Sequence, residues 1–187
     1  MCSLREHGTR GCWHGQVVVA GTIAQEGCFL EERMPYQVHT PEEHEAAIKK
    51  KIGGPFGCVI VRDNKIVGEG YNSVLEDLDP TSHGEMVAIR AACKNLGTHD
   101  LSGCTLYTSG EPCPMCYGAI WWARIEKVYY ASTIEDALHY GEFDDKAIYE
   151  AMAKPPHKRQ IPCISHLHDE MTKLWQDFKS LANGAKY

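Results

Sequence analysis

Two short segments of this chain carry side chains that could hold a metal ion. The first contains His83, and the second contains Cys113 and Cys116. One imidazole and two thiolates are ligands that Zn²⁺ prefers, at distances of about 2.0–2.3 Å. A structural zinc site needs a fourth protein ligand, whereas a catalytic zinc site leaves that position to water. We therefore expect one Zn²⁺ per chain, held by His83, Cys113 and Cys116.

Glu85 follows His83 by two residues and supplies a carboxylate beside this expected site. If Glu85 were the fourth ligand, no water would remain as a nucleophile, so we expect it to transfer protons instead. Proton transfer by a well-placed carboxylate typically contributes about 10²–10⁴-fold to a rate. The competing interpretation is a structural zinc site in which Glu85 is an ordinary helix residue. That interpretation leaves the missing fourth ligand unexplained.

Both segments occur where a loop leads into a predicted helix. Residues 79–82 form a typical helix start, and the helix that follows is predicted to end at Gly97. A second helix is predicted over residues 115–124. Cys113 and Cys116 stand one turn apart at its start, so both sulfur atoms can face one ion. The exposed backbone amides of a helix start also favour ionised thiols.

Strands alternate with helices along most of the chain. Strands are predicted at 56–62, 66–71, 104–108 and 127–131, further helices from 41 to about 53 and at 144–153, an extended segment at 160–165, and a last helix around Trp175 and Phe178. Such alternation is typical of the α/β class. We expect a three-layer α/β/α sandwich around a central mixed sheet, with the two ligand-bearing helices side by side.

Length and composition predict one globular domain, because the chain has 187 residues of which 43% are hydrophobic. Residues 1–40 differ from the rest and are interpreted as an N-terminal extension of unknown role. Residues 41–187 are interpreted as the zinc-dependent domain.

The nine cysteines are an odd number without regular spacing. They indicate reduced thiols and a cytoplasmic protein.

The charge and hydropathy of the chain limit its partners. The formal net charge is −6 and the sequence pI is about 5.9, so no large basic field is available to attract nucleic acid or acidic lipid. No apolar stretch approaches the roughly 20 residues that a membrane-spanning helix requires. We expect neither nucleic acid nor a membrane as a partner.

With these motifs the sequence resembles the cytidine/deoxycytidylate deaminase superfamily and, within it, the small bacterial-type guanine deaminases. The resemblance extends from about Gly53 to Tyr187. Besides the two zinc motifs, it rests on the following segments: residues 53–57, Asn72, residues 79–81, residues 117–124, residues 143–145, residues 148–150, residues 154–155 and the terminal Tyr187. The zinc motifs are common to the superfamily, whereas residues 143–145 and the terminal aromatic indicate guanine.

The resemblance implies a role for several residues around the zinc site. Asn72 would hydrogen-bond the edge of the purine, and Phe56 would stack on its ring. The backbone at Gly84 would receive the group that is attacked. Asp145 would bind the substrate and relay protons beside Glu85. Each of these roles is an expectation from the family.

The end of the chain is implied to complete the site of a second subunit. In the family, the C-terminal segment crosses to the partner subunit, so the resemblance implies a domain-swapped homodimer in which Tyr187 closes the neighbouring pocket. Phe143 is expected to bind substrate as well. Glu142 looks like a one-residue insertion relative to the family. Glu142 or Asp144 therefore remains an alternative to Asp145 as the second acidic residue of the site.

The expected function is zinc-dependent hydrolytic deamination of guanine, a small purine, to xanthine and ammonia. Water would attack C2, and Glu85 would protonate the neighbouring ring nitrogen and then the leaving amine. One alternative is the same reaction on the nucleoside guanosine. Further alternatives are a deaminase of a base in tRNA or of the cytosine type, and a zinc-binding module without catalysis that serves as an interaction surface.

Overall fold

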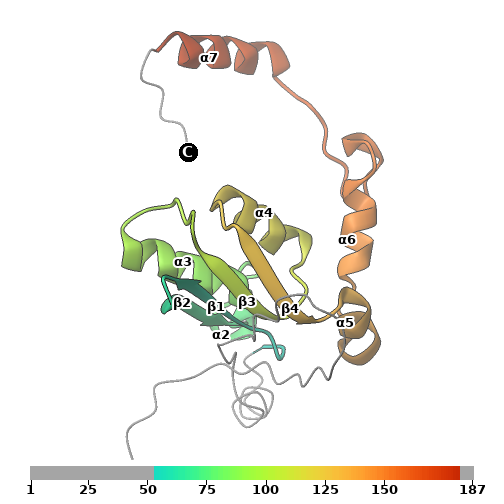
Figure 1. The fold of residues 1–187 in the computed structure, drawn as a ribbon. Coiled ribbons are helices and arrows are strands. Elements are labelled where there is room, and N and C mark those ends of the chain that lie inside the picture. Colours follow the sequence, from blue (N-terminus) through green and yellow to red (C-terminus); the bar gives the residue numbers. More distant parts are fainter. Residues whose placement is uncertain (1–52, 182–187) are drawn as a thin grey trace, which may run out of the picture.

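The computed structural model describes residues 53–181, which form a sheet domain followed by a helical C-terminal arm (Figure 1). The sheet has four strands in the order β2-β1-β3-β4. Their bounds are Gly57–Arg62 for β1, Lys65–Tyr71 for β2, Thr105–Gly110 for β3 and Lys127–Ser132 for β4. The β1 strand pairs antiparallel with both β2 and β3, whereas β3 and β4 run parallel. The predicted α/β fold around a central mixed sheet is confirmed.

The hairpin between β1 and β2 follows directly from its turn residues. Asp63 and Asn64 both adopt positive φ angles, 50° and 57°. This conformation matches the right-handed twist of the flanking strands, and Asp and Asn tolerate it better than most residues. The register shifts between Ile60 and Val61. The tight turn predicted at this position is confirmed.

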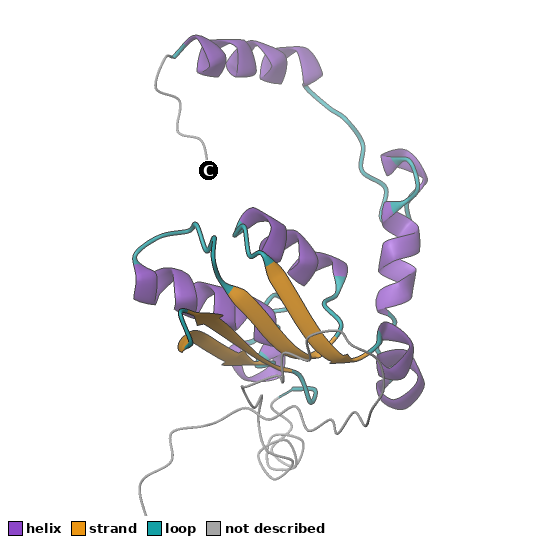
Figure 2. Cartoon of the chain, in the orientation of Figure 1, coloured by secondary structure: helices purple, strands orange, loops and turns teal. Residues whose placement is uncertain are grey.

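Two helices, α3 (Gly84–Leu96) and α4 (Pro114–Trp122), pack beside each other against the sheet (Figure 2). Gly97 ends α3 in a left-handed conformation, as predicted. The two helices and the strands enclose one hydrophobic core, formed by Cys58, Ile60, Ala88, Ile89, Ala92, Leu101, Cys104, Leu106, Ile120 and Ala123. This core fixes where the two helices start relative to each other.

Glycines in β2 let α3 approach the sheet closely. A Cβ atom built on Gly70 would lie 2.6 Å from the backbone nitrogen of Ala88 and 2.6 Å from the carbonyl oxygen of Gly84. Cβ atoms essentially never approach a non-bonded atom so closely, so a side chain at Gly70 would push the start of α3 away. Gly68 makes the same kind of close approach one turn further along the helix. The position of the α3 N-terminus therefore depends on the absence of side chains in β2.

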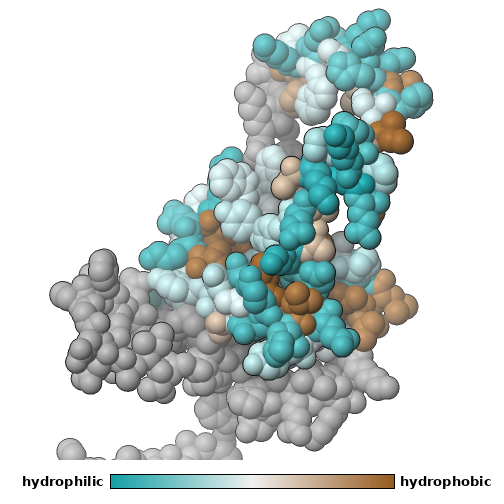
Figure 3. All heavy atoms as spheres, turned by 90° about the vertical axis from the view of Figure 1, so that its right-hand side faces the viewer, coloured by the Kyte–Doolittle hydropathy of each residue, from teal (hydrophilic) through white to brown (hydrophobic). Residues whose placement is uncertain are grey.

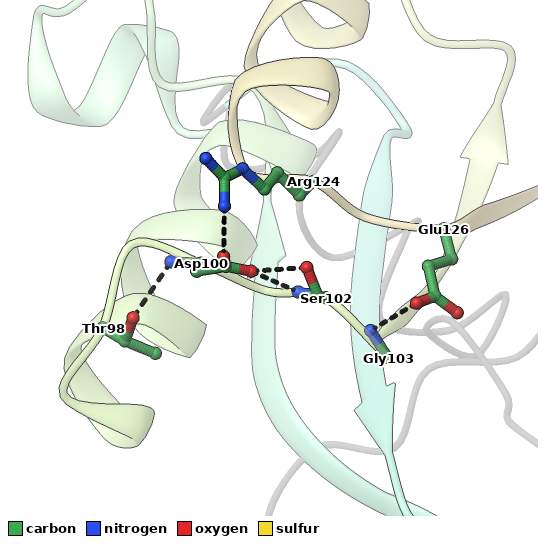
Figure 4. Close-up of polar contacts among 6 residues, drawn as sticks. All are labelled: Thr98, Asp100, Ser102, Gly103, Arg124 and Glu126. Carbon is green, nitrogen blue, oxygen red and sulfur yellow. Dashed lines mark hydrogen bonds and ion pairs between the residues drawn. The ribbon is translucent and has the colours of Figure 1, made fainter. Parts of the chain in front are cut away.

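The loop before β3 is tied to the segment that follows α4 (Figure 4). Arg124 donates a hydrogen bond to Asp100 at 2.6 Å, and Asp100 also accepts from the backbone nitrogen of Ser102 at 2.9 Å. The Glu126 carboxylate accepts from the backbone nitrogen of Gly103 at 3.0 Å. These contacts tie the segment after α4 to the loop that leads into β3.

The remaining elements are short helices and the C-terminal arm. Their bounds are Val74–Asp77 for α2, Ile134–Gly141 for α5, Asp145–Met152 for α6, Pro156–Lys158 for the 3₁₀ helix η1 and His168–Ser180 for α7. Helix α6 and the last helix were predicted, whereas α5 was missed. Thr133 and Asp136 form a capping box at the start of α5, and this is a sequence signal that could have revealed it.

Two sequence predictions fall on residues that the structure does not describe. The helix expected from residue 41 lies outside residues 53–181, as does the N-terminal extension 1–40. Within residues 53–181, no helix combines the length and the apolar character needed to cross a membrane.

Candidate active site

The three predicted metal ligands come from the starts of α3 and α4. His83 is the residue before the first turn of α3, and Cys113 holds the same position before α4. Pro114 occupies the first turn of α4, where its fixed φ angle suits a helix start. Before α3, the Asp79 carboxylate accepts hydrogen bonds from the backbone nitrogen and the hydroxyl of Thr81, at 2.8 and 2.7 Å. These local features fix the loops that present the ligands.

The ligand atoms are spaced as a tetrahedral zinc ion requires. The Nδ1 atom of His83 lies 3.6 Å from the Sγ atom of Cys113 and 3.6 Å from the Sγ atom of Cys116. With Zn–N and Zn–S bonds of about 2.0 and 2.3 Å, tetrahedral geometry separates N and S by about 3.5 Å. Within the described residues, this is the one cluster in which three such ligand atoms lie within 4.8 Å of one another. The residues present therefore fit one Zn²⁺.

The thiols of Cys113 and Cys116 have pKa values that are shifted in opposite directions. The pKa of Cys113 is lowered to about 4, first because Cys116 donates a hydrogen bond to it and also because His83 is close. The pKa of Cys116 is raised, first because its proton is the one that Cys113 accepts. Without a cation the sulfur pair therefore keeps one proton between its two members. A bound divalent ion removes this constraint, because both sulfur atoms ligate it as thiolates.

Glu85 lies beside the cluster but outside the set of mutually close ligand atoms. It is 6% exposed, and its Oε2 atom lies 3.5 Å from the Sγ atom of Cys116. Its other carboxylate oxygen accepts a hydrogen bond from the hydroxyl of Thr108 at 3.4 Å. Burial raises the pKa of Glu85, which brings a carboxyl group closer to the range useful for proton transfer at neutral pH.

Asn72 and Phe56 lie together at the end of the sheet near the start of α3. The backbone nitrogen of Asn72 donates to the carbonyl oxygen of Phe56 at 2.8 Å. The Asn72 side chain is buried, and its Oδ1 atom accepts from the backbone nitrogen of Val74 at 3.4 Å. Since the oxygen is directed at this amide, the NH₂ group of Asn72 points away from Val74. Gly84, the first residue of α3, is close enough that a Cβ on it would lie 3.1 Å from the Phe56 carbonyl oxygen.

The structure separates the three acidic residues that the sequence left as alternatives. Asp144 caps α6, because its Oδ1 atom accepts from the backbone nitrogen of Ala147 at 3.0 Å. Glu142 is an exposed residue that ends α5 with a positive φ angle of 60°. Asp145 is half-buried, and its pKa is raised, first by burial and next by the nearby Cys113 thiolate. Asp145 is therefore close enough to Cys113 for the charge of the thiolate to act on its carboxyl group.

An aromatic pair joins the segment between α5 and α6 to the sheet. The rings of Phe143 and Phe56 meet edge to face, with their centroids 5.2 Å apart. Phe143 is also 42% exposed, so it covers one side of Phe56 while remaining accessible. Tyr187, the other expected aromatic residue, lies outside the described residues.

One residue in contact with the site was missed in the sequence. Thr108 is 1% exposed and approaches the Glu85 carboxylate from β3. Residues of a strand alternate between its faces, so Thr108 shares the core-facing side with Leu106. A polar residue at a core-facing position of a strand is the signal that could have identified it.

A comparison with known families bears directly on this cluster. The model of the cytidine and deoxycytidylate deaminase zinc-binding region matches residues 31–132, which include all three ligands and Glu85. The chain belongs to this deaminase family. The arrangement of His83, Cys113 and Cys116 is thus that of a zinc-binding deaminase, and one Zn²⁺ is its cofactor.

Individual relatives within the deaminase family are similar over most of the chain. The curated guanine deaminase of Bacillus subtilis is 49% identical over 136 residues, which are 73% of this chain and 86% of that protein. A crystal structure of guanine deaminase from the same organism has a TM-score of 0.71 at 46% identity, and the match covers 77% of this chain and 91% of that one. The tRNA-specific adenosine deaminase of Aquifex aeolicus is 36% identical over 69% of this chain and 83% of that protein.

Replacement of Cys116 by serine is expected to abolish stable zinc binding. Loss of residues that only support a metal ligand costs about 10–100-fold in affinity, so loss of a ligand should weaken the zinc affinity of this deaminase by more than 100-fold. Zinc bound per chain can be measured by elemental analysis after dialysis. The exposed Cys163 provides the control, because Cys163→Ser should keep one zinc per chain. A Cys116→Ser protein that retains full zinc would contradict the assignment.

Proposed function

We propose that this protein is a zinc-dependent guanine deaminase that converts guanine and water to xanthine and ammonia. The observation that carries the proposal is a buried carboxylate beside a three-ligand zinc cluster, in a chain that is 49% identical to a guanine deaminase over 86% of that protein. Guanine is a small planar base, and its exocyclic amine on C2 is the leaving group of this reaction.

The proton transfers are assigned to Glu85. Bound Zn²⁺ supplies a Lewis acid that lowers the pKa of a coordinated water molecule to about 7. Glu85 takes a proton from the attacking water and delivers it to the ring nitrogen next to C2. It then takes the second proton from the new C2 hydroxyl and gives it to the amine, so that the C2=O bond forms as the C2–N bond breaks and ammonia leaves. The hydrogen bond from the Thr108 hydroxyl holds one of its oxygens in place for these transfers.

The purine is assigned to the space next to Phe56 and Asn72. The NH₂ group of Asn72, directed away from Val74, would donate to an acceptor on the edge of the base. Phe56 would stack on the ring, with Phe143 supporting it from the side, and an apolar ring face gains from this contact by excluding water. The backbone at Gly84, where α3 starts, would lie against the attacked group.

Asp145 is assigned as the second acidic residue of the site. It is withdrawn from water and lies close enough to Cys113 and His83 to interact electrostatically with both. A carboxylate there would accept a hydrogen bond from a donor of guanine and assist proton transfer beside Glu85. Asp144 is occupied as a helix cap, which favours Asp145 over it.

Two related reactions are the alternatives to guanine. Guanosine requires the same groups around the base together with space for a ribose. Deamination of a base within tRNA is suggested by the 36% identity to a tRNA-specific adenosine deaminase. Binding of a polyanion needs clustered Lys and Arg residues, whereas the chain carries a formal net charge of −6. The charge therefore favours a small substrate and argues against nucleic acid as a partner.

The C-terminal arm is proposed to exchange between two copies of the chain. Helix α7 lies apart from the sheet domain (Figure 1) and does not pack extensively on any other described element. Its apolar side chains are nevertheless numerous and at least one-third exposed: Met171, Leu174, Trp175 and Phe178. Burying one such side chain fully contributes about 1.5–3 kcal/mol. A second copy of the chain would provide the surface that covers them.

The sheet domain offers apolar surface that such an arm could cover. Trp121 and Trp122 at the end of α4 are 72% and 62% exposed. Hydrophobic side chains also reach the surface on the side of α5 and α6 (Figure 3), where Leu138 and Ile148 are exposed. In the proposed swapped homodimer, the arm of each subunit brings Tyr187 to the pocket of the other.

The described cysteines are all free thiols, which supports a cytoplasmic location.

The substrate is tested by ammonia release from guanine, guanosine, cytosine, cytidine and adenine with zinc-loaded protein. Guanine is expected to have the highest kcat/KM, and a higher value for any other compound would contradict the proposal.

Asn72→Ala should lower kcat/KM for guanine about 10–100-fold, because a hydrogen bond to a buried group is lost. The matched control is Asn95→Ala at the exposed end of α3, which should match the unaltered protein. Zinc content should be the same in both variants.

Glu85→Gln is expected to keep zinc and lose turnover. The amide has nearly the same shape but cannot accept and return a proton, so kcat should fall by at least about 10²–10⁴-fold. Stopped assays of xanthine formation and zinc analysis on the same sample separate the two effects. Glu69→Gln on the exposed side of β2 serves as control. Near-normal turnover in Glu85→Gln would remove Glu85 from the proton transfers.

Mixing two inactive variants tests the exchanged arm. Glu85→Gln has a defective site but an intact terminal tyrosine, whereas deletion of Tyr187 leaves Glu85 intact. Random swapped dimers should recover roughly a quarter of the normal activity, since half of them are mixed and each mixed dimer has one complete site. The two variants are co-expressed, and xanthine formation is compared with that of each variant alone. No recovery in dimers shown to be mixed would contradict the exchange.

A further inference from the structure

Helix α6 carries the proposed acidic residue of the site but is weakly attached to the rest of the molecule. Apart from Asp145 and Ala151, which are half-buried, its residues are exposed. Among the described elements it packs modestly on α5 and α4. An exposed helix of two turns has little stability of its own. Asp145 is therefore placed reliably only if specific contacts hold α6 in position.

Tyr149 makes such a contact. Its hydroxyl donates a hydrogen bond to the carbonyl oxygen of Pro112 at 3.0 Å. Pro112 is buried, and a buried carbonyl group needs a hydrogen-bond partner. Within the part of the chain that the structure describes, this is the one hydrogen bond that joins an α6 side chain to the sheet domain.

The hydrogen bond connects α6 directly to the metal cluster. Pro112 is bonded to Cys113, whose carbonyl oxygen accepts from the backbone nitrogen of Tyr117 in the first turn of α4. Residues four apart lie on the same side of a helix, so Tyr149 and Asp145 share one face of α6. The side of α6 that is tied to the ligand loop is thus the side that bears the carboxylate.

We propose that Tyr149 is a positioning residue, whose hydroxyl holds α6 on the Pro112–Cys113 loop and thereby sets the distance between Asp145 and the metal cluster. The proposal rests on the proposed function, since it assigns Tyr149 to the same site. Phe143 acts at the other end, where its contact with Phe56 fixes the chain just before α6. Two contacts on either side of Asp145 prevent the helix from rotating about either one.

Tyr149→Phe tests the proposal because it keeps the ring and removes the hydroxyl alone. The kcat/KM for guanine is expected to fall about 10-fold, which is the effect of losing one hydrogen bond. Zinc content and the thermal midpoint should stay close to normal. In a double-mutant cycle, the same change made in the Asp145→Asn protein should have little further effect. Tyr140→Phe, at an 82% exposed position on α5, is the control and should match the unaltered protein.

Amide hydrogen exchange provides a readout that does not depend on activity. Tyr149→Phe should accelerate exchange in α6 while leaving α3 unchanged, because α6 loses its tie to the loop. If the unaltered protein does not deaminate guanine but Tyr149→Phe still accelerates exchange in α6, the proposed function is wrong, whereas the role of Tyr149 in holding α6 is supported. If guanine is deaminated and Tyr149→Phe changes neither kcat/KM nor exchange, the tie is wrong. Additive losses in the cycle would overturn the action of Tyr149 through Asp145.

Discussion

The imidazole of His83 and the thiol of Cys113 lie 3.6 Å apart although they belong to the starts of two different helices. Neither loop could hold a divalent ion alone, since one offers a single ligand and the other offers two. The two loops are brought together because α3 and α4 pack on one core and because glycines in β2 let α3 lie against the sheet. The backbone amide of Cys116 in the first turn of α4 also donates to the Cys113 sulfur, which favours the thiolate. The remaining groups of the proposed site are arranged around this meeting point.

The carboxylates around the cluster differ in how they are held. Glu85 is buried at the start of α3 and lies close to both Cys116 and Thr108. Asp145 comes from a helix that the sheet domain holds by few contacts. In the proposed site, one carboxylate is fixed by the packing of α3, and the position of the other depends on the segment that carries it. The hydrogen bond between Tyr149 and Pro112, which are distant in sequence, would hold this second carboxylate in position.

The sequence was most informative where chemistry restricts the residue type. The metal ligands, Glu85, the turn at Asp63 and Asn64 and the end of α3 at Gly97 were all predictable, because each needs particular side chains or backbone angles. Contacts between distant segments were not. Thr108 beside Glu85 and Tyr149 on Pro112 depend on how strands and helices pack, which no local pattern records. The proposal of Asp145 in preference to Asp144 likewise required the observation that Asp144 caps α6.

Three protein side chains are proposed to hold the zinc ion, with its fourth position left to solvent. The decisive experiment is a crystal structure of the zinc-loaded protein in which the metal is located by anomalous scattering. We expect two sulfur ligands at about 2.3 Å, one histidine nitrogen at about 2.0–2.1 Å and one solvent molecule, with the Glu85 carboxylate next to that molecule. A fourth protein side chain bound to the zinc, or a metal that does not contact all of His83, Cys113 and Cys116, would contradict this arrangement.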